Sequence, residues 1–178
     1  MAFYVQYRYL RYLAESLIIL FSVGYLIADP VVPIAKGFLY VREKGYNRSP
    51  EIDTWNSFTE VDMGSPYCAS FVSYMNHLAG IKAPVSAYAP DQVKRNNVPF
   101  SQIKTGDIFG IYFPSKGRVA HVGFVEQVKG SYLLTVEANT SPDAKAGSSS
   151  DRDGEGVYAR RRPVYLMKQQ NNKYSHYE

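Results

Sequence analysis

The stretch that decides the fold is Gly64-Ser65-Pro66-Tyr67-Cys68-Ala69-Ser70-Phe71-Val72-Ser73-Tyr74. Proline is favoured in the first turn of a helix, because its missing N–H has no helical partner there. Pro66 therefore predicts a helix start, and one face of that helix then collects Cys68, Val72, Met75 and Ala79. Gly80 is a typical stop, so we predict a helix over residues 67–79 with a cysteine in its first turn.

The segments around this helix predict an α+β fold. Upstream, residues 31–44 and 51–60 have apolar side chains at helical spacing. Downstream, four runs are typical of strands, namely residues 107–113, 119–128, 132–138 and 156–163, and a Ser-, Gly- and Asp-rich stretch over 140–155 predicts an exposed loop. Helices followed by consecutive strands indicate N-terminal helices packed on a small antiparallel sheet.

Composition limits the classes of function. The chain has 178 residues, of which 46% are hydrophobic and 20% charged, as expected for one globular domain with a short appendage. Its one cysteine, Cys68, excludes an intramolecular disulfide framework and a cysteine-cluster zinc site. The net charge of +4 suits an anionic partner such as a cell wall or a lipid surface, and is too weak by itself to indicate nucleic acid.

Residues 1–30 differ from the rest in composition. Several tyrosines with Arg8 and Arg11 precede an uncharged run over residues 16–28. This run is shorter than the roughly 20 residues of a spanning helix, which leaves an export signal, a membrane anchor and a helix packed on the domain as interpretations. After this hydrophobic segment we expect one domain over residues 31–168 and a polar, frayed tail over residues 169–178.

Cys68 and His121 are candidates for a thiol site. Free backbone N–H groups and the dipole at a helix start favour a thiolate, which needs a nearby base to become a catalyst. His121 lies on a predicted strand. His77 shares the helix of Cys68 but lies about 13 Å farther along it by helical rise, and His176 lies in the tail.

A hairpin between residues 119–128 and 132–138 can supply the third residue. If Gly130 is the centre of a three-residue turn, paired residues sum to 260, so His121 faces Asn139 and has Glu137 as a diagonal neighbour on the same face. Either side chain can orient an imidazole, whereas a one-residue slip moves both to the far face. The spacing permits both the Glu137 and the Asn139 arrangement.

These motifs resemble those of CHAP domains, the cysteine, histidine-dependent amidohydrolases/peptidases. In chain order, Pro66-Tyr67-Cys68-Ala69-Ser70-Phe71-Val72 is similar to the nucleophile motif, Gly106-Asp107-Ile108 to a strand start, Ala120-His121-Val122-Gly123-Phe124-Val125-Glu126 to the histidine strand, Val136-Glu137-Ala138-Asn139-Thr140 to the Glu-x-Asn-Thr segment, and Gly156-Val157-Tyr158 with the arginines at 160–162 to the closing strand. Upstream, Glu43 with Asn47-Arg48 fits a Glu…Asn-Arg pattern. The similarity covers about residues 32–166.

The resemblance implies a papain-like α+β fold of the NlpC/P60 type and a catalytic domain over residues 31–168 that hydrolyses amide bonds of peptidoglycan. It implies Cys68 as nucleophile, His121 as general base, and Glu137 or Asn139 as the orienting residue. The residues expected to bind substrate are Tyr67, Asn47, Arg48, Tyr112 and Arg160. Some phage members bind calcium through an acidic loop before the cysteine, but residues 45–49 contain no Asp cluster, so we expect no metal and no cofactor.

Three classes of function are compatible with these features. The first is a peptidoglycan amidase or endopeptidase, in a phage lytic or virion role or in bacterial wall remodelling. The second is a non-catalytic wall-binding or virion structural protein, and the presence of Cys68, His121 and Glu137 argues against it. The third is a cysteine enzyme that acts on another amide or acyl group.

The expected partners and location follow from the first class. Peptidoglycan is the expected partner, together with a lipid membrane contacted by residues 1–30 or a larger virion assembly, and no nucleic acid. The expected location is at the membrane, in the cell envelope after export, or in a virion.

Overall fold

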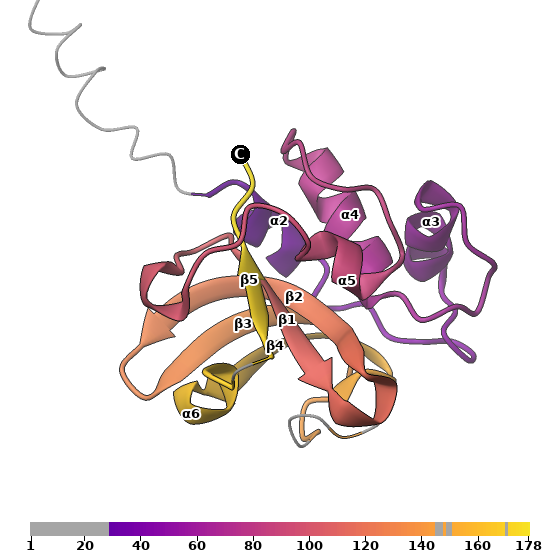
Figure 1. Ribbon diagram of the computed structural model, residues 1–178. Coiled ribbons are helices and arrows are strands. Elements are labelled where there is room, and N and C mark those ends of the chain that lie inside the picture. The colour runs from indigo at the N-terminus through magenta and orange to yellow at the C-terminus, as the bar shows by residue number, and fades with distance from the viewer. Residues whose placement is uncertain (1–28, 145–147, 149–150, 170) are drawn as a thin grey trace, which may run out of the picture.

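The computed structural model describes residues 29–144, 148, 151–169 and 171–178 (Figure 1). Its helices are α2 (Val31–Lys36), α3 (Pro50–Phe58), α4 (Cys68–Leu78), α5 (Ala89–Gln92) and α6 (Val164–Met167), with 3₁₀ turns η1 (Phe100–Gln102) and η2 (Pro114–Lys116). Its strands are β1 (Ile108–Phe113), β2 (Arg118–Lys129), β3 (Tyr132–Thr140), β4 (Gly156–Pro163) and β5 (Lys173–Ser175). Residues 1–28 of the expected hydrophobic segment lie outside the described part. Within that part, no helix has the length and apolar character needed to cross a membrane.

The strands form one antiparallel sheet in the order β4-β3-β2-β1-β5. Strands β1 to β4 are the meander expected from the sequence. Figure 1 shows α2 to α5 gathered at one side of this sheet, with α6 near its other side. The predicted α+β class, with N-terminal helices packed on a small antiparallel sheet, is confirmed.

Helix α4 places the cysteine against the sheet. Its buried face includes Cys68, Phe71, Val72 and Met75, close to the face predicted from the sequence. The ring of Phe71 lies 6.2 Å from that of Phe124 on β2 and 5.0 Å from that of Trp55 on α3. Edge-to-face aromatic packing of this kind fixes the rotation of a helix about its axis, and so it orients the first turn toward β2.

The helix expected over residues 31–44 ends at Lys36 instead. Gly37 follows it, and the chain then turns toward the start of β4, where Arg42 forms a β-bridge with Gly156 and the Glu43 N–H donates to the Glu155 carbonyl at 2.8 Å. Tertiary pairing here outweighs the helical spacing of the apolar residues. One consequence is that Glu43 lies beside the start of α4.

The expectation of a frayed tail is wrong for the last residues. Lys173–Ser175 pairs with β1 as β5, and both Tyr174 and Ser175 are buried. His176 Nδ1 lies 2.6 Å from the carboxylate oxygen Oδ1 of Asp107. A three-residue strand is too short to show a period of two in a polar stretch, so composition alone hides it.

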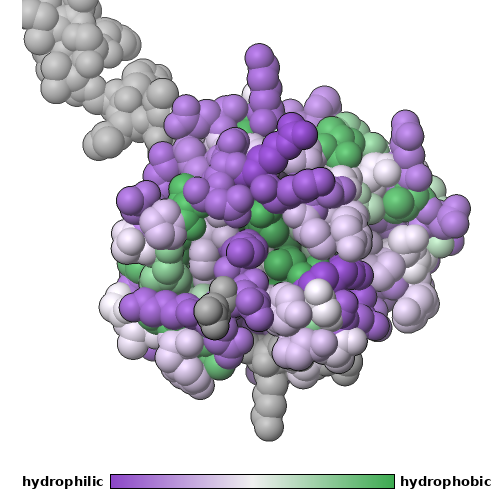
Figure 2. Space-filling model, in the orientation of Figure 1, coloured by the Kyte–Doolittle hydropathy of each residue, from purple (hydrophilic) through white to green (hydrophobic). Residues whose placement is uncertain are grey.

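Apolar side chains cover both faces of the sheet. On the helix side, Val122 and Phe124 pack with residues of α2 to α5 in the larger core. On the opposite face, Phe109, Leu133 and Tyr174 belong to a second, smaller core. Figure 2 shows polar side chains over most of the visible surface, with small hydrophobic patches between them.

Candidate active site

Cys68 is the first residue of α4, and contacts of the preceding residue, Tyr67, hold it in position. Cys68 is 5% exposed. Tyr67 is fully buried beside Trp55, and its hydroxyl donates to Glu43 Oε1 at 3.1 Å and to the Gly154 carbonyl at 3.3 Å. The start of the helix is therefore tied to two separate loops. The first N–H groups of a helix have no intrahelical partner, and at this position they favour a thiolate on the first residue.

His121 on β2 and Glu137 on β3 form a buried pair. His121 Nε2 lies 2.8 Å from Glu137 Oε2, and both side chains are 0% exposed. Phe109 packs beside the imidazole, with ring centroids 6.3 Å apart. The other ring nitrogen, Nδ1, makes no aligned hydrogen bond among the described residues, and this leaves it for the Cys68 thiol, which interacts with the ring.

The register of this hairpin results from two compensating features. Lys129 pairs with Tyr132, so the turn has two residues and pairs near it sum to 261 rather than the expected 260. A bulge at Glu126, between Val125 and Gln127, restores the sum of 260 from Val125↔Thr135 onward. The expected diagonal relation of His121 to Glu137 therefore holds, although the expected three-residue turn is wrong.

The charges of the site favour a thiolate–imidazolium pair. Burial raises the pKa of the Cys68 thiol, but the hydrogen bond and charge of His121 outweigh it, so the net pKa lies below its ordinary value of 9.0. Burial likewise lowers the pKa of His121, yet its interactions with Cys68 and Glu137 raise it to about 9. Both shifts favour the state in which the proton resides on the imidazole.

Glu137 keeps its charge because of Arg162 on β4. Burial raises the pKa of Glu137, but the Arg162 guanidinium and His121 hold it well below 4.5. Arg162 Nε donates to Glu137 Oε1 at 2.8 Å, Nη2 donates to Oε2, and Nη1 donates to Asp151 Oδ2 at 2.9 Å. Thr135 Oγ1 donates to Glu137 Oε1 at 2.5 Å. With its oxygens fully engaged, the carboxylate holds the imidazole in one orientation.

Asn139 lies near this network but bonds elsewhere. It is fully buried with a φ of 60°, and its Nδ2 donates to the Arg152 carbonyl at 2.7 Å. Its Oδ1 has no hydrogen-bond partner among the described residues. Of the two arrangements that the sequence left open, the contact to the imidazole belongs to Glu137.

The residues expected to bind substrate have mostly intramolecular contacts. Tyr67 is buried as described, and Asn47 is 1% exposed, with its N–H donating to Glu43 Oε2 at 2.8 Å. Arg48 is exposed and forms a bidentate ion pair with Asp53, in which Nε donates to Oδ1 at 2.6 Å and Nη2 donates to Oδ2 at 2.9 Å. Tyr112 is half-buried on β1. Arg160 is 9% exposed and donates to Asp151 Oδ1 at 2.9 Å, so its guanidinium is already occupied.

Sequence reasoning missed Arg162 and Asp151 as parts of the site. A signal for Arg162 exists in the arginine run over residues 160–162 on β4, because Arg160 and Arg162 share one face of that strand, as Thr135 and Glu137 do on its neighbour β3. Polar side chains that alternate on two adjacent strands share one face of the sheet. Asp151 has no comparable signal, since it lies in the stretch expected to be an exposed loop.

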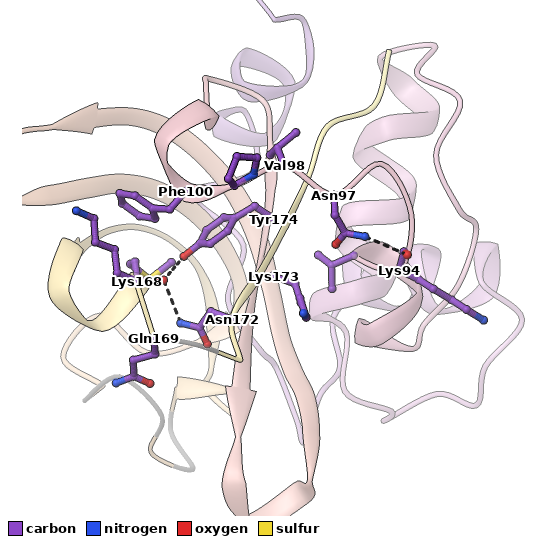
Figure 3. A pocket seen from close by; sticks show the side chains of 12 residues that line it. Lys94, Asn97, Val98, Phe100, Lys168, Gln169, Asn172, Lys173 and Tyr174 are labelled. Carbon is purple, nitrogen blue, oxygen red and sulfur yellow. Dashed lines mark hydrogen bonds between the residues drawn. The ribbon is translucent and has the colours of Figure 1, made fainter.

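A hollow of about 610 Å³ lies away from this site, at η1, α6 and β5 (Figure 3). Lys94, Lys168 and Lys173 line it, and its lining includes no acidic side chain. Figure 3 shows Lys94 and Lys168 pointing to opposite sides, so their charges do not converge on one ligand position. None of the lining residues belongs to the Cys68–His121–Glu137 group. Within the described stretches, no three His, Cys, Asp or Glu side chains are grouped closely enough to hold a metal ion.

The central part of the chain is similar to a known protein family. Residues 60–139 match the family model of the CHAP domain. Over this span the chain is similar to a CHAP domain. The matched span includes Cys68, His121 and Glu137, and the resemblance seen in the motifs is thereby confirmed. CHAP domains are a family of peptidoglycan-hydrolase-like amidases and peptidases.

Among solved structures, the chain is similar to a protein of Staphylococcus aureus subsp. aureus Mu50 described as "similar to lipoprotein, NLP/P60 family". The identity is 14% and the TM-score 0.42, over 79% of this chain and 42% of that one. The present chain therefore spans less than half of that structure's length. No curated protein matches the sequence significantly.

The lowered thiol pKa makes a prediction that needs no substrate. Cys68 is the one cysteine of the chain, so iodoacetamide labels a single thiol. We expect the rate of labelling to rise with a midpoint below the ordinary pKa of 9.0, because His121 stabilises the thiolate. In His121→Gln the midpoint should move upward, since burial then acts unopposed by the ring. Mass spectrometry over a pH series measures this; His77→Gln is the control, and equal midpoints in all three proteins would contradict the assignment.

Gly123 on β2 sets the space available to Glu137. A Cβ at this position would lie 2.9 Å from Glu137 Cγ and 2.9 Å from the Val136 carbonyl oxygen. We expect Gly123→Ala to lower the free energy of unfolding by about 1–3 kcal/mol, as overpacking does in other cores, and to slow labelling of Cys68. Urea unfolding measures the first effect. Gly45→Ala is a matched control, because a Cβ there meets nothing closer than 3.8 Å; similar losses in both variants would contradict the steric argument.

Proposed function

We propose that the CHAP-like domain of this chain is a cysteine-type hydrolase that cleaves an amide bond of peptidoglycan. The observation that carries this proposal is the buried line from Cys68 through His121 to Glu137, in which Nε2 of the imidazole lies 2.8 Å from the carboxylate and the thiol pKa is lowered. A thiolate beside an imidazolium, with a carboxylate behind it, is the arrangement that nucleophilic attack on an amide requires.

The proposed mechanism assigns each proton to an atom. The Cys68 thiolate attacks the amide carbonyl carbon, and the Cys68 backbone N–H at the start of α4 stabilises the resulting oxyanion. His121 donates the proton on Nδ1 to the leaving amine as the C–N bond breaks, which leaves a thioester on Cys68. The neutral imidazole then takes a proton from water as the hydroxide forms a C–O bond to the thioester carbon. The C–S bond breaks, the product acid leaves, and the Cys68 thiolate is restored beside the imidazolium. Glu137 holds the ring throughout through Nε2.

The test is digestion of purified peptidoglycan by the full chain and by Cys68→Ala under reducing conditions. Fragments that appear with the first protein and not with the second support the proposal, and mass spectrometry identifies the bond. A new N-terminal alanine indicates an amidase, and a free cross-bridge amine indicates an endopeptidase. The absence of new fragments from the folded full chain would contradict catalysis and favour a wall-binding protein, which pelleting with insoluble peptidoglycan would detect.

We also propose that the chain acts at the cell envelope, where this substrate lies, in a phage lytic or virion role or in wall remodelling. Residues 1–30 are proposed to contact the membrane. Vesicle flotation of the full chain and of a chain that lacks residues 1–29 tests this contact. Equal flotation of the two proteins would contradict it.

A further inference from the structure

The segment over residues 151–154 lies beside the nucleophile and is held from several sides. The Asp151 carboxylate accepts from Arg160 and Arg162 at 2.9 Å each. The Arg152 carbonyl accepts from Asn139 Nδ2 at 2.7 Å, and the Gly154 N–H donates to the Asn139 carbonyl at 3.2 Å. This segment is thereby fixed to the end of β3.

Gly154 also ties the segment to the start of α4. Its carbonyl accepts from the hydroxyl of Tyr67, the residue that precedes Cys68. A Cβ on Gly154 would lie 2.1 Å from the Thr140 carbonyl carbon, so the segment lies directly on the strand. The backbone of Arg152 is therefore held against the end of β3, in a segment that also contacts the start of α4.

Arg152 differs from the other two arginines of this region. Arg160 and Arg162 both pair with Asp151. Among the described residues, no carboxylate pairs with the guanidinium of Arg152, and its buried Nε has no hydrogen-bond partner. The side chain is half-buried, and its charge is one of the influences that lower the pKa of Cys68. A half-buried cation that has an unused donor, and whose charge acts on the Cys68 thiol, is suited to a ligand anion.

We propose that Arg152 binds a carboxylate of the substrate, so that the site takes amides with a free carboxylate beside the scissile bond. The inference rests on the proposed hydrolase function and adds a substrate class to it. A guanidinium matches a carboxylate because its planar fork of N–H donors can meet both oxygens at once. Arg152 would thereby orient the scissile carbonyl over Cys68.

The first experiment compares two alkylating reagents that differ in charge. In both reactions the Cys68 sulfur forms a bond to the CH₂ carbon and iodide leaves, but iodoacetate carries a carboxylate and iodoacetamide is neutral. Both reactions use the same thiolate. The ratio of the iodoacetate rate to the iodoacetamide rate therefore does not depend on the fraction of Cys68 that is ionised. We expect the ratio, relative to free cysteine, to be raised in the wild type and to fall about tenfold in Arg152→Gln, the size of one charge-assisted hydrogen bond.

Two variants make this result specific. Arg152→Lys keeps the charge but not the fork, so its ratio should lie between those of the wild type and Arg152→Gln. Arg95→Gln removes an equal charge from an exposed position elsewhere and should leave the ratio unchanged. A ratio in Arg152→Gln within twofold of the wild type, or an equal fall in Arg95→Gln, would overturn the inference. If Arg152→Gln does not fold by thermal melting, Arg152→Lys against the wild type decides in the same way.

The second experiment uses hydrolysis once the cleaved bond is known. Two synthetic substrates are compared, one with the free carboxylate and one with its primary amide. We expect the wild type to prefer the carboxylate about tenfold in kcat/KM, mainly through KM, and Arg152→Gln to lose the preference. A hydrolase without this preference would overturn the Arg152 inference alone. An inactive protein that keeps the Arg152-dependent labelling ratio would contradict the hydrolase proposal alone.

Discussion

His121→Gln is expected to lose hydrolysis of peptidoglycan by a factor on the order of 10³ or more, as the removal of a general base does in other triads. The variant loses the proton donor for the leaving amine and the charge that lowers the Cys68 pKa, so two steps fail together. The release of soluble fragments, timed against the wild type, measures this effect.

A matched control lies on the helix of Cys68. His77 is exposed near the end of α4, and its ring packs at a tilt beside those of Phe58 and Tyr74. His77→Gln makes the same chemical change and should keep the wild-type rate. Retention of more than a tenth of the activity in His121→Gln, with both variants folded, would contradict the role of His121.

Arg162→Met is expected to have the largest effect on stability. Arg162 is 1% exposed and joins Glu137 to Asp151, and breaking a buried ion pair from one side costs about 3–5 kcal/mol, because a charge remains buried without its partner. A domain of this size is stable by only about 5–15 kcal/mol. Chemical denaturation should therefore show a marked decrease in the free energy of unfolding. Arg48→Met breaks the exposed pair with Asp53 and should leave the free energy of unfolding nearly unchanged.

The same variant should also change the response to acid. The pKa of Glu137 is held well below 4.5 in the folded state, so the carboxylate adds stability above that value and loses it as the pH falls through the lower, folded pKa. Without Arg162 the folded pKa rises and this contribution shrinks. Acid unfolding, followed by fluorescence of Trp55, should then begin at a higher pH than in the wild type. An unchanged acid midpoint and an unchanged denaturation midpoint would contradict the role of Arg162.

The local sequence predicts the helix of Cys68 and the strands of the meander well, because their patterns are long. The relation of His121 to Glu137 was also predicted, but through a turn of the wrong length. The bulge at Glu126 that corrects it has no local signal: its side chain is held by Lys36 of α2, with Nζ 2.5 Å from Oε1, a contact across 90 residues. A bulge adds one unpaired residue to one strand, and at this one the extra residue contacts a helix distant in the sequence.

The parts of the site that sequence analysis missed share one property. Asp151 and Arg152 lie in a stretch whose composition indicates an exposed loop, yet Asp151 is fully buried between two arginines. Its place depends on β4 returning beside β3, a relation between distant segments. By contrast, Cys68 and His121 lie within regular elements, so their surroundings follow from periodicity.

The absence of a second cysteine in the chain affects how Cys68 responds to an oxidising environment. A thiolate is the form that peroxides attack, and the first product is a sulfenic acid. In many proteins a second cysteine then condenses with that group and protects it as a disulfide. This chain has no second cysteine, so the sulfenic acid can proceed to the irreversible sulfinic acid. The feature that excludes an intramolecular disulfide thus leaves the Cys68 thiolate open to irreversible oxidation, which an external thiol would slow.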